Sequence, residues 1–430
     1  MRVLITESWL FASSVLISIG LVSGSVVVVA IGMLILGTGG AARLWSRLSL
    51  EEVRVRRAVS EHRLYVGETV DVTLTVENGK PIPVPWMEVQ TTLPRGMQVI
   101  GGRTHLGATG SVVLDRSTSL GRKDRIVWPV QLRALRRGYF RVGPTRLRSG
   151  DIFGFFEREA MTGFPPDTIV VYPRTYTLPE LGLDSERPFG DLRGGNRIYE
   201  DPSRVIGTRD YQQGDPMKRI DWKATARVMR LQSRLYEPSR TESVVIVLNI
   251  PTFQQPWQGS DPVLLERGVS LAASLAHAYS DLGSSVGLIA NGSFPDADRP
   301  IRIGVSNHPW QLNRLLEALA MVTSFTTSRM SEELESKSPP LPVGATLLVI
   351  AAVMTEDLAA TLMRLRGEGY AIHVVKTSAP PWSAELGAIG VTEMAPVMQR
   401  FEAEMQRQGL PVGTAADDAA EQALGMRVTA

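Results

Sequence analysis

Three aspartates in the middle of the chain are the residues whose type and spacing best suit chemistry. These are Asp210, Asp215 and Asp221, and they are interleaved with Arg209, Lys218, Arg219, Lys223 and Arg227. Two paired carboxylates would serve a hydrolase as acid and base. Surrounding cations favour the ionised carboxylate instead, which suits salt bridges better than proton transfer.

No nucleophile or base accompanies the three aspartates, so a non-catalytic role is the stronger interpretation. Asp221 and Arg227 are six residues apart and flank a predicted helical turn. We expect a charge-paired network that fixes a loop against a sheet, with Trp222 buried beneath it. The sequence therefore predicts that the protein is not an enzyme, and a hydrolase using the aspartates is kept as an alternative.

Composition excludes several other kinds of site. The chain has no cysteine, which rules out disulfides and thiolate metal sites, and its five histidines are scattered. Its net charge of +2 is too small for a dedicated nucleic-acid-binding protein. No glycine-rich phosphate loop is present. We expect no cofactor and no nucleic-acid partner.

The N-terminal segment, residues 1–45, is predicted to enter a membrane. Residues 9–37 carry no charge, and as one helix they would be about 43 Å long, more than the roughly 30 Å of a bilayer core. The N-terminal segment forms either one tilted span or a hairpin of two spans, about Val3–Val22 and Gly24–Ala42. Arginines on both flanks favour the hairpin, with the soluble domains in the cytoplasm.

Two soluble domains follow. Residues 46–165 alternate apolar and polar side chains, as in 70–76, between frequent turns, which predicts an all-β sandwich. Residues 166–410 alternate apolar runs with amphipathic stretches, which predicts an α/β domain with a parallel sheet. Its expected strands are 244–250, 286–290, 346–353 and 371–375, and its expected helices begin near 261, 309, 355 and 394. Residues 411–430 are predicted to be a flexible tail.

The acidic stretch resembles the signature of the domain-of-unknown-function 58 family, a bacterial and archaeal group. The residues that match it are Arg209, Tyr211, Gly214, Asp215, Ile220, Asp221, Trp222, Ala226 and Arg227, followed by Tyr236, Glu237 and Pro238. Ser239 replaces a glutamate of the pattern. The run 148–156 resembles a second family element. The resemblance implies paired N-terminal spans, an immunoglobulin-like β-sandwich and a von Willebrand factor A-like, Rossmann-like α/β domain.

A von Willebrand factor A-like domain implies a divalent-cation site in an Asp-x-Ser-x-Ser loop after its first strand. Here Asn249, Pro251 and Phe253 stand at those three positions. An amide, a ring and a phenyl group cannot supply one carboxylate and two hydroxyls to a hard cation. The sequence predicts a degenerate site that holds no metal or holds one only weakly.

The resemblance implies a membrane-anchored scaffold or adaptor that binds protein partners. A MoxR-type AAA+ ATPase in a chaperone or cell-envelope system is the partner it suggests. Partner-binding or structural roles fall to the signature residues Arg209, Tyr211, Gly214, Asp215, Asp221, Trp222, Arg227 and Glu237. A divalent-cation-dependent adhesion or chelatase-accessory module is the second alternative.

Overall fold

The structure is a computed structural model, and it describes residues 8–101, 103–107, 111–185, 188–189, 199–212, 215, 217–239, 242–294, 299–336, 340–382 and 384–413. The chain divides into two compact units, Met1–Tyr172 and Pro173–Ala430. The expected boundary lay between residues 165 and 166. It lies later because strand β12 (Asp167–Tyr172) pairs with two strands of the first unit, β9 (Gly138–Val142) and β2 (Arg63–Tyr65). Most of the expected tail, from residue 414, is outside the described residues.

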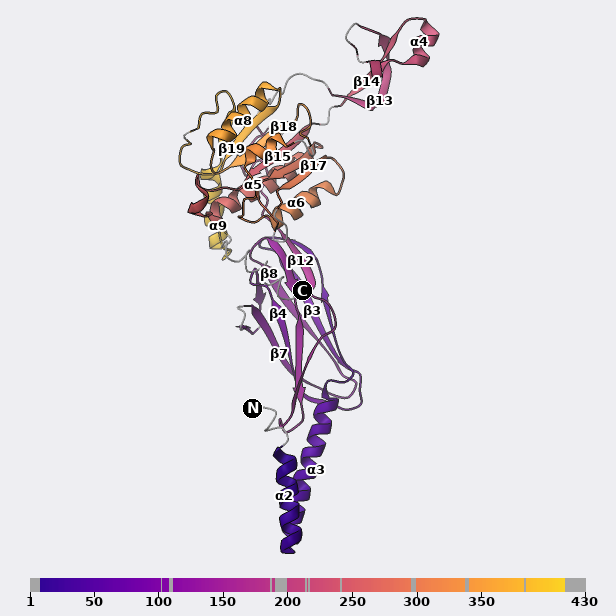
Figure 1. Cartoon of the computed structure of the whole chain (residues 1–430), viewed down its shortest axis with the longest axis vertical. Helices are drawn as coiled ribbons and strands as arrows, with labels where there is room; N and C mark the ends of the chain where they lie inside the picture. Colours follow the sequence, from indigo (N-terminus) through magenta and orange to yellow (C-terminus); the bar gives the residue numbers. More distant parts are fainter. Residues whose placement is uncertain are drawn as a thin grey trace. The chain divides into compact units, whose positions relative to one another are not determined.

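The first unit begins with two helices, α2 (Ser8–Ser23) and α3 (Val26–Ser49), which run side by side (Figure 1). The turn between them, at Gly24 and Ser25, is where the sequence predicted it. Small residues let the helices approach closely: a Cβ atom added to Gly32 would lie 2.6 Å from Cγ1 of Ile17. By length and composition, α3 could cross a membrane, whereas the apolar part of α2 is shorter.

A lysine joins α3 to the β-domain. Lys80, in the turn after β3 (Thr69–Asn78), donates from Nζ to the carbonyl oxygens of Leu48 at 2.6 Å and Glu51 at 2.9 Å, and also to that of Ser49. These carbonyls lie at the C-terminus of α3 and just after it, and a cation there complements the helix dipole. The end of α3 is thus tied to the sheet that follows it.

The β-domain contains three sheets, as the alternating pattern predicted in outline. One has the order β1-β3-β8-β5, the second β11-β10-β4-β7-β6, and the third β2-β12-β9. The remaining strands are β1 (Val53–Val59), β4 (Val84–Leu93), β5 (Met97–Ile100), β6 (Thr104–Leu106), β7 (Val112–Leu120), β8 (Arg125–Ala134), β10 (Thr145–Gly150) and β11 (Glu157–Met161). Every second residue of β3 from Val70 to Asn78 is buried, which builds a core between the sheets.

The second unit contains a six-stranded sheet in the order β17-β16-β15-β18-β19-β20. Its strands are β15 (Ser243–Asn249), β16 (Ser285–Ala290), β17 (Ile301–Ser306), β18 (Thr346–Ala351), β19 (Ala371–Lys376) and β20 (Gly390–Glu393). All neighbours are parallel except β16 and β17. The four expected strands are present, and β17 and β20 add two edges that the sequence did not predict.

Helices cover both faces of this sheet, which accounts for its continuous apolar strands (Figure 1). They are α5 (Pro262–Asp281), α6 (Gln311–Met321), α7 (Met330–Glu335), α8 (Glu356–Gly367) and α9 (Ala395–Arg407). On one face α5 lies against Leu248 and Ile350 through Gly268. On the other, Val247 and Val349 share a buried cluster with residues of α7 and α8.

The family signature lies on a separate element. Strands β13 (Tyr199–Asp210) and β14 (Gln232–Ser239) pair antiparallel as a two-stranded sheet of their own, and helix α4 (Trp222–Val228) lies between them in the chain (Figure 1). We expected a loop fixed against the main sheet. In the described part of the chain the segment is instead a strand pair, because β13 and β14 are each other's ladder partners.

Candidate functional site

The end of the β13–β14 hairpin is a small folded cap built from residues 210–232, which we call the hairpin tip. Its base is closed by two backbone hydrogen bonds, from Tyr211 N to Leu231 O at 2.9 Å and from Asp221 N to Gln232 O at 2.8 Å. Between them the chain forms a single 3₁₀ turn, Met217–Arg219, and then α4. Ile220 is 3% exposed and supplies the apolar centre of the tip.

Asp221 begins α4. Its Oδ1 accepts hydrogen bonds from the backbone N–H groups of Lys223 and Ala224, both at 3.0 Å, which is the N-cap arrangement. Its Oδ2 accepts from Nε of Arg234 at 3.3 Å across the hairpin. These contacts, the bond from Ala224 first, lower the pKa of Asp221. The predicted helical turn is confirmed, and Arg227 lies in its last turn.

The other two aspartates have partners of their own. Arg209 donates to Oδ1 of Asp215 at 2.8 Å, and Gln212 N donates to its Oδ2 at 3.1 Å. The hydrogen bond from Arg209 is the main cause that lowers the pKa of Asp215. Gln232 donates to Oδ1 of Asp210 at 2.5 Å. Each carboxylate is therefore engaged in holding the tip. The lowered pKa values of Asp215 and Asp221 make them weak bases, and at neutral pH they carry no proton to donate as acids.

The expectation that Trp222 is buried was wrong. Its side chain is 64% exposed, whereas that of Asp221, the preceding residue, binds Arg234 across the hairpin. Other apolar side chains of the tip are exposed with it: Met217 at 67%, Val228 at 56%, Met229 at 87% and Leu231 at 45%. We call these five residues the apolar tip.

Met229 adopts a backbone conformation that its side chain disfavours. It follows α4 with φ of 56° and ψ of 27°, and its N–H donates to Thr225 O at 2.8 Å. This left-handed position at a helix end is usually glycine, which has no Cβ to strain the backbone. A methionine that is both strained and almost fully exposed indicates that the side chain is kept for its surface.

The hairpin tip also carries cationic side chains. Lys218, Lys223, Arg227 and Arg230 are all exposed, so the tip offers both apolar and basic side chains to a partner. Two signature positions cannot be placed in this surface. Gly214 lies outside the described residues, and Glu237 is described only by its backbone in β14.

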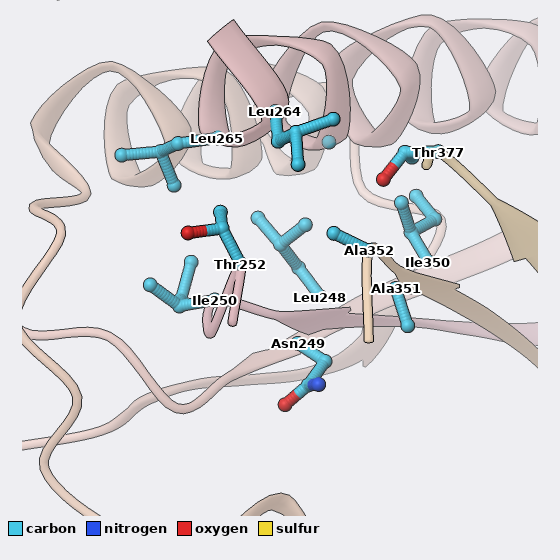
Figure 2. Close-up of a pocket in the computed structure, with 11 residues that line it drawn as sticks. Leu248, Asn249, Ile250, Thr252, Leu264, Leu265, Ile350, Ala351, Ala352 and Thr377 are labelled. Atoms are coloured by element: carbon cyan, nitrogen blue, oxygen red, sulfur yellow. The ribbon is translucent and has the colours of Figure 1, made fainter. Parts of the chain in front are cut away.

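The second candidate is the side of the main sheet where the carboxyl ends of β15 and β18 lie (Figure 2). Open α/β sheets bind ligands on this side, where the strand order reverses. A small pocket of about 10 Å³ lies there, lined by Leu248, Asn249, Ile250, Thr252, Leu264, Leu265, Gly268, Ile350, Ala351, Ala352 and Thr377. That volume admits about one water molecule and no larger ligand.

Asn249 is bound to the protein by both ends of its amide. Nδ2 donates to Val353 O at 3.2 Å, and Oδ1 accepts from Nδ2 of Asn291 at 3.2 Å. The side chain is 8% exposed and points away from α5 (Figure 2). Thr252, the one hydroxyl of the loop, accepts a hydrogen bond from Asp261 N at 2.7 Å, and Asp261 itself caps α5.

These groups do not fit a divalent cation. Pro251 carries no oxygen on its side chain, and Phe253 places a phenyl ring, 38% exposed, at the third position. Over the described residues, no three histidine, cysteine, aspartate or glutamate side chains come together as metal ligands. In this structure Asn249, at the end of β15, binds the residues that follow β16 and β18 and so joins strand ends to each other.

Three partner residues of these sites were missed by sequence reasoning. Arg234 and Gln232 bind Asp221 and Asp210 from the opposite strand, and Asn291 binds Asn249 from the end of β16. The hairpin register of β13 and β14 accounts for Gln232, which it places opposite Asp210. It does not account for Arg234, which pairs with Thr208. No local pattern marks Asn291, because parallel strands bring together residues that are far apart in sequence.

Comparisons with known proteins agree with the signature. The family model described as "Protein of unknown function DUF58" matches residues 207–408. The "Uncharacterized protein YeaD" of Bacillus subtilis (strain 168) is 26% identical over 318 residues, which are 74% of each chain.

Two of the solved structures that resemble this chain match part of it. A CARDB domain of the PF1109 protein from Pyrococcus furiosus is 15% identical and covers 28% of this chain and 90% of that one, with a TM-score of 0.19. A type II cohesin domain from the cellulosome of Acetivibrio cellulolyticus is 10% identical and covers 27% and 94%, with a TM-score of 0.21. The hairpin tip and the α/β sheet both fall within the matched family region, and this chain belongs to the DUF58 family.

Proposed function

We propose that this protein is a membrane-anchored, non-enzymatic scaffold that binds a protein partner through its hairpin tip. The observation that carries the proposal is the pairing of a rigid framework with an exposed apolar surface. Asp221, Asp215 and Arg209 hold the tip in one conformation, while Trp222 and Met229 remain exposed. Exposed tryptophan and methionine are the side chains that protein interfaces favour at their centres.

The composition of the tip indicates the chemistry of the partner. A tip that offers both apolar side chains and the cations of Lys218, Lys223, Arg227 and Arg230 fits a groove that offers both apolar and acidic side chains. Methionine adapts its shape to such grooves. An AAA+ ATPase of the MoxR type is the partner we propose, on the strength of the family resemblance together with this surface.

The anchor would be α2 and α3, inserted as a helical hairpin with the soluble units on the cytoplasmic side. Support comes from the close packing of the two apolar helices at Gly32, from the length and composition of α3, and from the arginines that follow Ala42. The β-domain would be immunoglobulin-like. Its sheets, which are antiparallel except for the β2–β12 pair, pack around a shared core and support this.

The second unit would be a von Willebrand factor A-like domain that has lost its cation site. Its strand order is 3-2-1-4-5-6 when the strands from β15 to β20 are numbered in turn, and its third strand is antiparallel. The amide of Asn249, bound at both ends, supports the loss. Recognition would then depend on side chains of the chain itself rather than on a shared metal ion.

The test is co-purification of the full chain from membranes, with wild type and Trp222→Ala compared. We expect the variant to lose the AAA+ ATPase while its melting temperature stays unchanged, because an exposed side chain adds little to stability. Trp310→Ala is the matched control, since Trp310 is 63% exposed and Trp222 is 64% exposed. Equal recovery with all three proteins would refute the role of the tip.

A further inference from the structure

The loop between β10 and β11 exposes three large apolar side chains within four residues of sequence. Ile152 is 59% exposed, Phe153 is 60% exposed and Phe155 is 64% exposed. The two phenylalanine rings stack on each other, with centroids 5.6 Å apart. Water is a poor environment for such a group, and an exposed cluster of this kind marks a contact surface.

The loop is held rigid from beneath. Asp151 is fully buried, and its two carboxylate oxygens accept hydrogen bonds from Phe153 N at 2.7 Å and Phe156 N at 2.6 Å. Nε1 of Trp86 donates to Asp151 O at 3.1 Å. Because the backbone is fixed in this way, the exposed side chains are already ordered and lose little entropy on binding.

The same loop contacts the N-terminal helices. Phe156 packs edge to face against Trp9 of α2, with ring centroids 6.1 Å apart. The guanidinium of Arg43, on α3, lies 5.8 Å from the centre of the Phe156 ring. Arg158, on β11, donates to Arg47 O of α3 at 2.9 Å. The loop is therefore fixed at one level along the helix pair.

That level is where the apolar part of α3 ends. Arg43 is its first charged residue, after an uncharged run that continues to Ala42. Tryptophan and arginine at the end of an apolar helix mark the boundary between hydrocarbon and headgroups. Trp9 and Arg43 are the residues that Phe156 contacts, so the exposed side chains of the loop lie beside this boundary.

We propose that residues 152–155 insert into the interfacial layer of the bilayer next to α2 and α3, as a third attachment of the protein to the membrane. The proposal rests on the membrane anchoring put forward above. Phenylalanine and isoleucine suit the boundary between headgroups and acyl chains. The exposed cations Arg47 and Arg158 complement anionic headgroups, and the nearby Glu157 is paired with Arg148.

This attachment would fix the orientation of the β-domain as well as its location. A helix pair alone allows the following domain to tilt, whereas a further contact with the bilayer, made by the loop, restricts that tilt. The bilayer is favoured over a protein as the occupant because the loop continues an apolar surface that the helices already form.

The chain has no cysteine, so a single introduced thiol can be labelled without background. We would attach a nitroxide label at Phe153→Cys, and separately at Phe155→Cys, in the full chain reconstituted into vesicles of phosphatidylcholine and phosphatidylglycerol. Collision with oxygen, which concentrates in lipid, and with a water-soluble nickel chelate reports depth. We expect the ratio of oxygen to nickel collisions to be several-fold higher at both positions than at an aqueous control.

Leu106→Cys is the aqueous control. Leu106 is 75% exposed and belongs to the same sheet as the loop. It lies at the opposite end of that sheet. Leu106 pairs with Val112, and Val112 pairs with Leu93 at the end of β4, whereas the loop lies beside Trp86 and Met87 near the start of β4. Val27→Cys, at a position 69% exposed on α3, reports the anchor itself. Both phenylalanines are exposed, so we expect these variants to keep the wild-type circular dichroism spectrum.

The outcomes separate the two proposals. Lipid exposure at positions 27, 153 and 155 supports the loop insertion. Lipid exposure at position 27, with positions 153 and 155 as accessible to nickel as position 106, overturns the loop insertion and keeps the anchor. Protection of positions 153 and 155 from both reagents identifies a protein contact and also overturns it. Water exposure at position 27 refutes the anchor on which the proposal rests.

Discussion

Replacing Asn249 by aspartate would restore the residue that a metal-binding loop has at this position. The structure indicates that the change destabilises the domain instead. Nδ2 of Asn249 donates to Val353 O at 3.2 Å, and a carboxylate in its place would direct an oxygen at that carbonyl. The hydrogen bond that Asn291 Nδ2 donates to Oδ1 of residue 249 would still form.

The size of the effect follows from burial. Asn249 is 8% exposed, and a buried acceptor that loses its donor costs about 1–3 kcal/mol, with more for the added buried charge. We expect a loss of about 2–4 kcal/mol in the free energy of unfolding at neutral pH, and a melting temperature lower by about 10 °C.

The loss should depend on pH. Burial and the facing carbonyl raise the pKa of the new carboxyl above its value in the unfolded chain. The protonated acid can donate to Val353 O as the amide does. The variant should therefore match wild type below the unfolded pKa, and its deficit should grow as pH rises through the raised folded pKa.

The assay is thermal unfolding of the full chain in nanodiscs, followed by circular dichroism at several pH values, with and without millimolar magnesium. Asn307→Asp is the matched control, because Asn307 is exposed in the same unit and its replacement should change little. An Asn249→Asp protein as stable as wild type at neutral pH, or one stabilised by magnesium, would refute the view that this loop is structural.

Other predictions concern the hairpin tip and a buried histidine. Met229→Gly should stabilise the tip by about 1 kcal/mol, since glycine relieves the left-handed backbone, yet weaken partner binding; melting and co-purification of the same samples check both. Asp221→Asn keeps an acceptor for the α4 N-cap and should still bind the partner. Asp221→Ala should lose both partner binding and the hydrogen-exchange protection of α4. Equal behaviour of the two variants would contradict the capping role. Burial lowers the pKa of His373 to about 4, so unfolding takes up a proton between about pH 6.5 and 4. The free energy of unfolding should therefore fall as pH falls through that window. In denaturation measured across these pH values, His373→Gln should reduce the dependence of stability on pH.

Local signals in the sequence predicted those elements that local interactions stabilise. Asp261 and Thr355 each precede an apolar helical pattern, and both cap their helices through side-chain oxygens. The buried strands were visible as apolar runs because a parallel sheet covered on both faces excludes polar residues. The turn at Gly24 was visible for a similar reason, since glycine tolerates its φ of 68°.

Long-range pairing was the part that the sequence did not reveal. Strand β17 has only one buried residue, Ile301, at its sheet edge and so lacks an apolar run. Trp222 was expected to be buried because apolar side chains usually are, but its exposure depends on which face of α4 the Asp221–Arg234 contact leaves free. Asp215 and Asp221 form ion pairs as expected, but Asp210 is bound by the neutral amide of Gln232, and Arg234 was not among the expected cations.

The central claim is that the apolar tip is the surface that binds the partner. The most direct test replaces Met229, which is 87% exposed, by a photo-crosslinking amino acid. The full chain is expressed in the membrane of its source cell. A second protein carries the same amino acid in place of Trp310 for comparison. We expect a single adduct at position 229 that contains an AAA+ ATPase, and none at position 310. Adducts at position 310 alone, or none at position 229 while the ATPase still co-purifies, would contradict the claim.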